Sequence, residues 1–211
     1  MKEKIVILGS SGHAKVIIEI IQAMGTYEII GVTTVDPKVK DKFFGYPVLG
    51  DDSILPQLKK DGVNLVAIGM GGYTNNSIRK EVYLNAKGLG FNCLTAIHPT
   101  AIISPSAKTG EGSVIFAGAI VHTDTVIGNN VIIATGSTVD HNTVIADHVL
   151  VSAGVSVGAN VRIGESSLLA IGSTVITGIK IGAHCLVAAG AVVVKEVLDG
   201  QKVFGVPATP K

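Results

Sequence analysis

The chain has 211 residues, with 17 basic and 16 acidic side chains and a formal net charge of +1, and this length allows one or two domains. The balanced charge without a basic block gives no indication of a nucleic-acid or anionic-membrane partner. No run of 18 apolar residues occurs, so we expect no membrane span. The chain start, MKEKIVILG, shows no signal-peptide pattern, and the widely separated Cys93 and Cys185 favour a cytoplasmic protein without disulfides.

Strand-like and helix-like segments alternate in the first half of the chain. The predicted strands are the apolar runs at 4–8, 28–34, 63–68 and 91–97. Helical periodicity predicts a helix that ends at Met24, before Gly25, and two more over 54–60 and 75–88. The alternation predicts a small, parallel, Rossmann-like α/β domain over residues 1–97.

The turn from Gly9 to His13 joins the first strand to the first helix. Its backbone N–H groups and the helix dipole could hold a phosphate, or the glycines could simply permit a tight turn. Lys15 stands where the dinucleotide-binding fingerprint requires its last glycine, and no acidic residue ends the second strand. We therefore do not expect NAD binding.

A six-residue repeat occupies residues 98–193 without insertion or deletion. Ile, Val or Leu fills the sixth place in fifteen of sixteen hexads, and Thr109 is the exception. Three hexads would form one triangular coil, with the sixth-place side chains filling the axis and the small fourth-place side chains also pointing inward. The third place is dominated by Gly, Asn, Asp and His, which tolerate positive φ, so we expect the corners there. The pattern predicts a solenoid of about five coils.

The second places form three columns, one for each corner. One is solvated in character, one is small and mostly apolar, and one holds a single histidine, His141, among small residues. The apolar column, which includes Ile171 and Ala189, is a candidate surface for a neighbouring subunit or a slender ligand. His141 is a candidate general base, because imidazole titrates near neutrality. A surface histidine without function is the alternative.

The other titratable side chains of the coil have simpler interpretations. We expect His148 and His184 to be corner residues. His122 lies eighteen residues before Asp140, so the two should stack on adjacent coils, and Asp140 could pair with His122 or orient His141. Cys185 falls in an inward column and Cys93 on a buried strand, which favours direct transfer over an acyl-enzyme. A zinc site needs about three converging imidazoles, and His141 and His148 lie in different columns, so we expect no metal.

The coil resembles the left-handed parallel β-helix of the hexapeptide-repeat acyltransferases. The order of parts, GSSGHAKV, then HPTAIISPSA, then VDHNTVI and finally FGVPA, is similar to bacterial sugar acetyltransferases, including UDP-4-amino-sugar (bacillosamine-type) N-acetyltransferases and sialic acid O-acetyltransferase-like proteins. The resemblance implies a β-helix domain over 98–194 with a C-terminal tail over 195–211. It also implies a homotrimer, with acetyl-CoA between adjacent coils and a nucleotide-sugar on the N-terminal domain.

The resemblance also assigns residues by position. It matches His141 to the catalytic base and Asp140 to the acidic residue beside it. It implies nucleotide-sugar contacts at Ser11, Gly12, His13 and Gly69, and acetyl-CoA contacts at Leu150, Ile171, Ala189 and Gly190.

The chain departs from the bacillosamine-type pattern at two places. Thr33 and Thr34 stand where an acidic pair is common, which leaves Asp36 as the candidate there, and Leu150 stands where a second histidine is found.

We therefore predict a cytoplasmic, acetyl-CoA-dependent acetyltransferase acting on the amino group of a nucleotide-linked sugar. O-acetylation of sialic acid or another sugar hydroxyl is one alternative. A non-catalytic β-helix assembly module is another.

Overall fold

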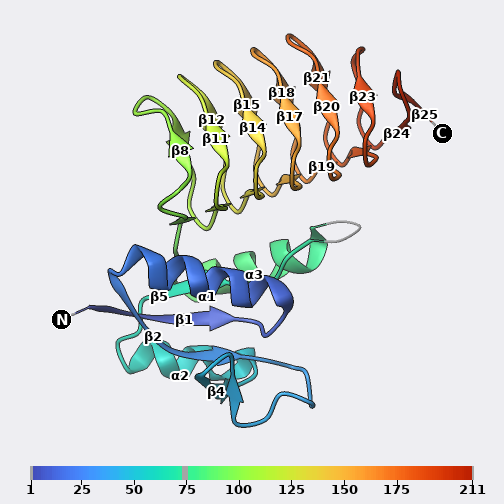
Figure 1. The fold of residues 1–211 in the computed structure, drawn as a ribbon. Helices are drawn as coiled ribbons and strands as arrows, with labels where there is room; N and C mark the ends of the chain where they lie inside the picture. Colours follow the sequence, from blue (N-terminus) through green and yellow to red (C-terminus); the bar gives the residue numbers. More distant parts are fainter. Residues whose placement is uncertain (1, 73–75, 211) are drawn as a thin grey trace. The chain divides into compact units, whose positions relative to one another are not determined.

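The computed structural model describes residues 2–72 and 76–210. The chain divides into two compact units. The first contains the chain up to Gly72 together with Ser77–Pro99, and the second contains Asn76 and the chain from Thr100 onward (Figure 1).

The first unit is built on a six-stranded sheet in the order β3-β4-β2-β1-β5-β6. The strands are β1 (Glu3–Leu8), β2 (Tyr27–Thr33), β3 (Lys42–Phe43), β4 (Tyr46–Gly50), β5 (Leu65–Ile68) and β6 (Asn92–Cys93). Neighbouring strands are parallel except for the antiparallel pair β3–β4. Residues 5–8 of the central strand β1 are fully buried, which explains why its sequence is an unbroken apolar run rather than an alternating one.

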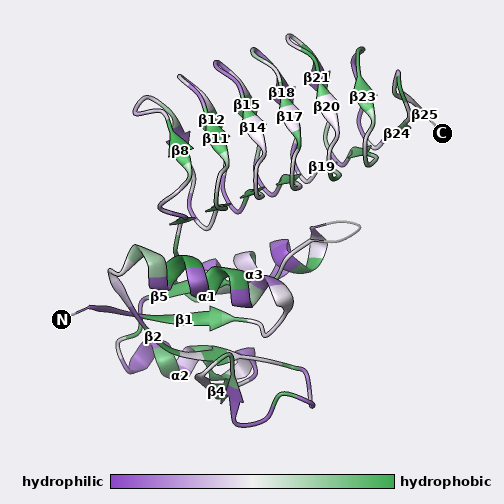
Figure 2. Ribbon diagram, viewed as in Figure 1, coloured by the Kyte–Doolittle hydropathy of each residue, from purple (hydrophilic) through white to green (hydrophobic). Residues whose placement is uncertain are grey.

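Three helices accompany this sheet. They are α1 (Gly12–Met24), α2 (Leu55–Lys60), which follows the 3₁₀ turn η1 (Asp52–Ile54), and α3 (Ser77–Gly88). Gly25 ends α1 in the left-handed conformation, with φ of 72°, as its sequence predicts. One core cluster joins side chains of β1 and β5 to Leu55 of α2 and to Tyr83 and Ala86 of α3, and the hydropathy of β1 and α1 is visible in Figure 2. The predicted first residue of the third helix, Asn75, lies outside the described residues.

Two details of the sheet differ from the sequence prediction. The β3–β4 hairpin was not expected, because its turn is Phe44-Gly45 with φ of 47° and 88°, and Phe-Gly is not among the usual turn dipeptides. The single strand expected over 91–97 is two short strands, β6 and β7 (Ala96–Ile97). The parallel pairing of β6 with β5 covers only Asn92 and Cys93, so the apolar run overstated the length of the strand.

The second unit is a solenoid whose strands stack as successive rungs in three sheets, and the pairing is parallel except at the last strand of the first sheet (Figure 1). The first sheet includes β10 (Val114–Ile115), β13 (Ile132–Ile133), β16 (Leu150–Val151), β19 (Leu168–Leu169), β22 (Leu186–Val187), β24 (Lys202–Phe204) and β25 (Thr209–Pro210). The second holds β8 (Ile102–Ile103), β11 (Ile120–Val121), β14 (Thr138–Val139), β17 (Ser156–Val157), β20 (Thr174–Val175) and β23 (Val192–Val193). The third holds β9 (Lys108–Thr109), β12 (Val126–Ile127), β15 (Val144–Ile145), β18 (Arg162–Ile163) and β21 (Lys180–Ile181).

The eighteen-residue stacking predicted from the hexads is confirmed by the strand register. Val114 pairs with Ile132, Ile120 with Thr138 and Val126 with Val144. Within the segment expected to be a tail, β24 pairs in parallel with β22, and β25 then pairs antiparallel with β24.

The third-place column forms the corners, as predicted. Every third-place residue from Gly112 to Gly190 has a positive φ, between 54° and 79°, and this includes His148 and His184. Glycine occurs in the first place for a different reason, which is the space available for a side chain. A Cβ on Gly164 would lie 2.5 Å from the backbone nitrogen of Ala183 and from the carbonyl carbon of Gly182 in the next coil. Adjacent coils approach too closely there for a side chain.

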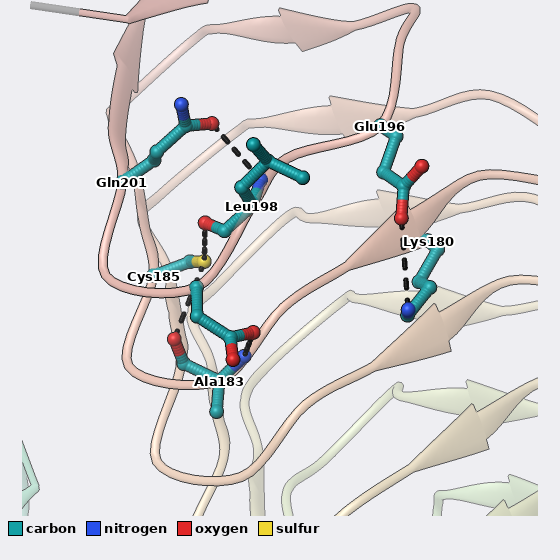
Figure 3. Close-up of polar contacts among 7 residues, drawn as sticks. Lys180, Ala183, Cys185, Glu196, Leu198 and Gln201 are labelled. Carbon is teal, nitrogen blue, oxygen red and sulfur yellow. Dashed lines mark hydrogen bonds and ion pairs between the residues drawn. The ribbon is translucent and has the colours of Figure 1, made fainter.

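The polar fourth-place side chains satisfy backbone groups inside the coil. Ser113 Oγ donates to the Gly128 carbonyl at 2.8 Å, and Ser167 Oγ donates to the Gly182 carbonyl at 2.8 Å. Cys185 takes this role near the C-terminal end, where its Sγ lies 3.1 Å from the Leu198 carbonyl oxygen (Figure 3). Burial raises the pKa of the Cys185 thiol, consistent with a structural thiol rather than a nucleophile.

Candidate active site

His141 lies on an exposed corner of the solenoid, between β14 and β15. The adjacent coils hold the backbone of this corner. The His141 carbonyl accepts the Asn160 N–H at 3.0 Å, and the Asn142 N–H donates to the Thr123 carbonyl at 3.0 Å. The imidazole therefore projects from a corner fixed on both sides by the stacked coils.

The side-chain amide of Asn142 is a close polar neighbour of the His141 ring. The ring Nδ1 lies 2.7 Å from Asn142 Oδ1. An amide oxygen can only accept a hydrogen bond, so this contact places the ring proton on Nδ1 and leaves the lone pair on Nε2. A neutral imidazole in this tautomer can take a proton at Nε2.

Asp140 supports the same corner through the backbone. Its Oδ1 accepts the His141 N–H at 2.7 Å. From the sequence, this carboxylate could orient His141 or pair with His122. In the structure it contacts the His141 backbone, and the side chain that contacts the imidazole is Asn142. Sequence reasoning assigned Asn142 only to the corner column. An amide side chain directly after a candidate base was the signal that could have identified it.

A groove runs over the coil face beside this corner. It has a volume of about 660 Å³ and extends from His122 and Asp140 across the next two coils. Its further lining consists of Thr138, Ser156, Val157, Gly158, Thr174, Val175, Ile176 and Thr177. A Cβ on Gly158 would lie 2.7 Å from the Thr177 nitrogen, so glycine allows the coils to approach closely there. The mostly small lining is suited to a slender ligand.

The residues predicted to contact acetyl-CoA lie elsewhere on the solenoid. Ile171, with 61% of its surface exposed, occupies the corner that precedes β20, and the exposed Ala189 and Gly190 occupy the corner that precedes β23. These corners lie where the strands of this sheet begin. His141 follows β14 and therefore lies where the strands of the same sheet end. Leu150 is only 7% exposed and packs with Ile132 and Leu168 in an apolar cluster. One chain therefore does not bring His141 together with the predicted cofactor residues.

The N-terminal unit gathers most of its predicted substrate residues at the start of α1. Ser11 accepts the His13 N–H at 3.2 Å and donates its hydroxyl to the Gly69 carbonyl at 2.9 Å. Gly69 is confined by packing, because a Cβ there would lie 2.8 Å from the Leu8 carbonyl oxygen and 3.0 Å from Ala14 Cβ. Ser11, Gly12, His13 and Gly69 therefore share the carboxyl edge of the sheet.

His13 is held beside a buried arginine that the sequence analysis did not single out. Arg79 on α3 is 0% exposed, and its Nη1 lies 3.3 Å from His13 Nε2. Burial, together with the Arg79 charge, lowers the pKa of His13 to about 3. Burial also lowers the pKa of Arg79, to about 9, so the guanidinium stays protonated at neutral pH. The sequence predicted a helix over 75–88 that carries Arg79 with Lys80 and Lys87, and it assigned Arg79 no role.

Asp36 lies in a neighbouring, more open region. It lines a cavity of about 330 Å³ with Thr34, Gly50 and Asp51, and its carboxylate accepts the Lys38 N–H at 2.9 Å. The Thr34 hydroxyl lies 2.5 Å from Ser10 Oγ, which connects this cavity to the turn before α1.

Although no acidic residue ends β2 in the sequence, a carboxylate lies at the end of this strand in the structure. Thr33 Oγ1 donates to Asp52 Oδ1 at 2.6 Å, so an acidic group reaches this position from η1.

Across residues 2–72 and 76–210, no three side chains of the His, Cys, Asp and Glu types gather closely enough to hold a metal ion. Within the same ranges, none of the helices has the length and apolar content to cross a membrane.

Two family models match this chain. Residues 4–86 match the PglD N-terminal domain, and residues 106–141 match the bacterial transferase hexapeptide (six repeats). A curated relative, UDP-N-acetylbacillosamine N-acetyltransferase of Bacillus subtilis strain 168, is 37% identical over 120 residues. This alignment covers 54% of the chain and 52% of that protein, so the chain matches about half the length of this relative.

Solved structures match over nearly the whole chain. A His-to-Asn mutant of perosamine N-acetyltransferase from Caulobacter crescentus, in complex with CoA and GDP-perosamine, is 35% identical with a TM-score of 0.92, covering 99% of this chain and 96% of that one. The acetyltransferase domain of PglB from Neisseria gonorrhoeae, in complex with acetyl coenzyme A, is 34% identical with a TM-score of 0.91 and full coverage of both chains.

The fold and the matched models define a hexapeptide-repeat acyltransferase with a PglD-type N-terminal domain. The chain belongs to the family of sugar N-acetyltransferases that includes perosamine N-acetyltransferase. The family and the fold predicted from the sequence are thereby confirmed.

Proposed function

We propose that this protein transfers the acetyl group of acetyl-CoA to an amino group of a nucleotide-linked amino sugar, with His141 as the general base. One observation carries the proposal. His141 is exposed beside a slender groove, and its Nδ1 contact with Asn142 leaves Nε2 able to accept a proton. The relatives support the reactants, because one is a perosamine N-acetyltransferase with CoA and GDP-perosamine and another holds acetyl coenzyme A.

The reaction balances with His141 as the only proton carrier. The neutral amine attacks the thioester carbonyl carbon while Nε2 removes one N–H proton. The C–S bond then breaks, and the imidazolium returns the proton to the departing thiolate, giving the acetamido sugar and CoA. General-base assistance of this kind contributes about 10²–10⁴ in rate. Asn142 would hold the ring, and Asp140 would hold the backbone beneath it.

The same proposal includes a homotrimer with sites between subunits. His141 and the predicted cofactor residues Ile171, Ala189 and Gly190 occupy different corners of one chain. A site that uses both groups requires the His141 corner of one subunit and the Ile171 corner of a second. Closed cyclic symmetry repeats this contact around the ring.

The acceptor would bind to the N-terminal unit. Ser11, Gly12, His13 and Gly69 supply hydrogen-bonding groups at the start of α1, and Asp36 lines the adjoining cavity. Leu150 has the least support among the proposed cofactor residues, because it is 7% exposed and packs with Ile132 and Leu168. We place the enzyme in the cytoplasm, where acetyl-CoA is available as co-substrate.

Thiol release from acetyl-CoA tests the reaction. The acceptors are GDP- and UDP-linked amino sugars, a dTDP-amino sugar and free sialic acid. We expect turnover with an amino sugar, and turnover with sialic acid alone would instead indicate O-acetylation. Silence with every acceptor, together with no thermal protection by acetyl-CoA, would favour an assembly module, because a ligand at a hundred times its Kd stabilises by about 2.7 kcal/mol.

Two histidine variants test the base. His141→Ala should lower kcat by about 10²–10⁴ while the KM for acetyl-CoA stays near the wild-type value. His184→Asn is the matched control, because His184 is an exposed third-place corner residue with φ of 55° and Asn occupies equivalent corners. Equal rates for the two variants would remove His141 as the base.

A further inference from the structure

Arg79 is a cation buried inside the N-terminal unit. Its Nη1 donates to the Ile68 carbonyl at 2.8 Å and to the Met70 carbonyl at 2.7 Å. The same nitrogen lies 3.3 Å from His13 Nε2. These contacts connect α3 to the carboxyl end of β5 and to the first turn of α1, beside Ser11 and Gly69.

The chemistry of the guanidinium determines the state of His13. Arginine has donors and no acceptor, so a proton on His13 Nε2 would face an N–H bond of a cation. Both Nη1 hydrogens already go to the Ile68 and Met70 carbonyls, so the favourable arrangement has an unprotonated Nε2 whose lone pair faces the cation and a proton on Nδ1. The backbone of Gly71 packs on the other side of the ring, because a Cβ there would lie 3.3 Å from His13 Cγ and 3.5 Å from Nδ1. The ring is thus enclosed between Arg79 and this loop.

The charged residues on β1, β2 and α1 are exposed. β5 is apolar along its whole length (Leu65–Ile68). The charged residues of β1 and β2 lie near the first residues of those strands and are exposed, as are the nearest charged residues of α1 itself: Glu3, Lys4, Glu28, Lys15 and Glu19. Compared with these residues, Arg79 is the cation that lies within contact distance of the His13 ring.

We propose that Arg79 is a positioning residue for substrate binding. It holds His13 as the neutral Nδ1–H tautomer. The hydrogen-bond donors that the start of α1 offers to the substrate then keep the same protonation state between pH 5 and 8. This inference rests on the proposed function, in which that turn binds the nucleotide-sugar. The affinity for the nucleotide-sugar then does not change with His13 protonation between pH 5 and 8. The lowered pKa of His13 agrees with this state.

Two-bond ¹H–¹⁵N spectra of the imidazoles test the tautomer directly. The chain has six histidines, so single substitutions assign each signal. In the wild-type protein, His13 should be a pure Nδ1–H tautomer that does not titrate between pH 5 and 8. In Arg79→Gln, both tautomers should be populated. A wild-type His13 with the proton on Nε2, or one that titrates near pH 6.5, would overturn the inference.

Kinetics test the consequence for binding. Arg79→Gln should raise the KM for the nucleotide-sugar about tenfold, the cost of one charge-assisted hydrogen bond, with kcat and the KM for acetyl-CoA near wild type. Arg162→Gln, which removes an exposed cation on β18, is the matched control and should change neither KM. If Arg79→Gln does not fold, Arg79→Lys keeps the charge without the planar donor geometry and is used in the same assays.

A double-mutant cycle separates positioning from general damage. In a His13→Asn background, the amide can still donate but no ring remains to be held, so Arg79→Gln should leave the KM for the nucleotide-sugar unchanged. A further tenfold loss in the double mutant would show that Arg79 acts independently of His13 and would overturn the inference. If no nucleotide-sugar reacts with the wild-type enzyme, the proposed function fails, while the spectra still decide the tautomer.

Discussion

At the scale of single residues, the state of the proposed base depends on its neighbour in sequence. Asn142 adopts the left-handed conformation, with φ of 57°, and the same residue forms the corner and contacts His141 Nδ1. A residue required for the turn therefore also selects the tautomer that leaves Nε2 free of a proton.

This dual role of Asn142 can be separated by substitution. Asn142→Gly keeps the corner conformation and removes the ring contact, so kcat should fall about tenfold, in line with the loss of one hydrogen bond, while both KM values stay near wild type. Steady-state kinetics provide the measurement. Asn160→Gly, at the equivalent corner of the next coil with the same φ of 57°, is the control and should not lower kcat. An unchanged kcat in Asn142→Gly would show that the ring needs no such support.

His13 makes stability depend on pH. Its pKa of about 3 in the folded protein lies below the ordinary value of 6.5, so below pH 6.5 the unfolded chain binds a proton that the folded chain does not. The stabilisation is complete above pH 6.5 and declines as the pH falls toward 3. Between pH 7.5 and 5.5 the loss should be about 1.4 kcal/mol.

Urea unfolding of the wild type and of His13→Gln at pH 7.5 and 5.5 checks this prediction. The variant lacks the titrating ring, so its loss of stability over this interval should be smaller by about that amount. Equal losses in the two proteins would show that His13 is exposed enough to titrate normally in the folded state.

At the scale of the repeating element, two kinds of glycine serve different purposes. Third-place glycines such as Gly154, with φ of 66° and open space around the missing Cβ, provide a backbone conformation. First-place Gly164 provides room for the next coil. The company of Asn, Asp and His identified the third-place glycines as corner residues from the sequence, whereas the close approach of the next coil at the first place became visible only in the structure.

Substitution distinguishes these glycines. Gly164→Ala should destabilise the coil by about 1–3 kcal/mol, because the added methyl group meets backbone atoms of the next coil that cannot move aside easily. Gly154→Asn should cost much less, since Asn adopts the same φ at positions 130, 142 and 160. Denaturant midpoints measure both. A larger loss at Gly154 than at Gly164 would contradict this assignment.

At the scale of the whole molecule, the proposed homotrimer takes the two corners of its site from two chains. A His141→Ala chain and an Ala189→Trp chain, which blocks the cofactor corner, should each be inactive alone. When the two variants are co-expressed, some interfaces are intact. These take His141 from the Ala189→Trp chain and the cofactor corner from the His141→Ala chain. About one quarter of the sites in random trimers should then recover activity.

Turnover of the co-expressed mixture, compared with each variant alone, gives the result. If both corners acted within one subunit, every site would carry one defect and the mixture would remain inactive. Sedimentation of the wild-type chain provides the companion measurement, and a monomer with full activity would contradict the proposed trimer.

The repeating part of the fold could be predicted almost completely from the sequence. The residue types within each hexad indicate which positions point inward, which point outward and which form the corner. Each coil contacts only its neighbours, so no contacts between distant parts of the chain are needed to predict the stacking. The α/β unit was less predictable in its details. The Phe44-Gly45 hairpin carries an unusual turn dipeptide, and the two-residue strand β6 is defined by pairing with β5 rather than by its own composition.

The sequence by itself determined the three-sided coil, its corner column, the parallel α/β unit and His141 as the candidate base, because these follow from local periodicity and from the chemistry of single side chains. Only the tertiary structure decided that Asn142 rather than Asp140 contacts the imidazole and that Arg79 is buried against His13. The physical reason is that these relations depend on side-chain direction and on contacts between elements, and neither is encoded by spacing along the chain.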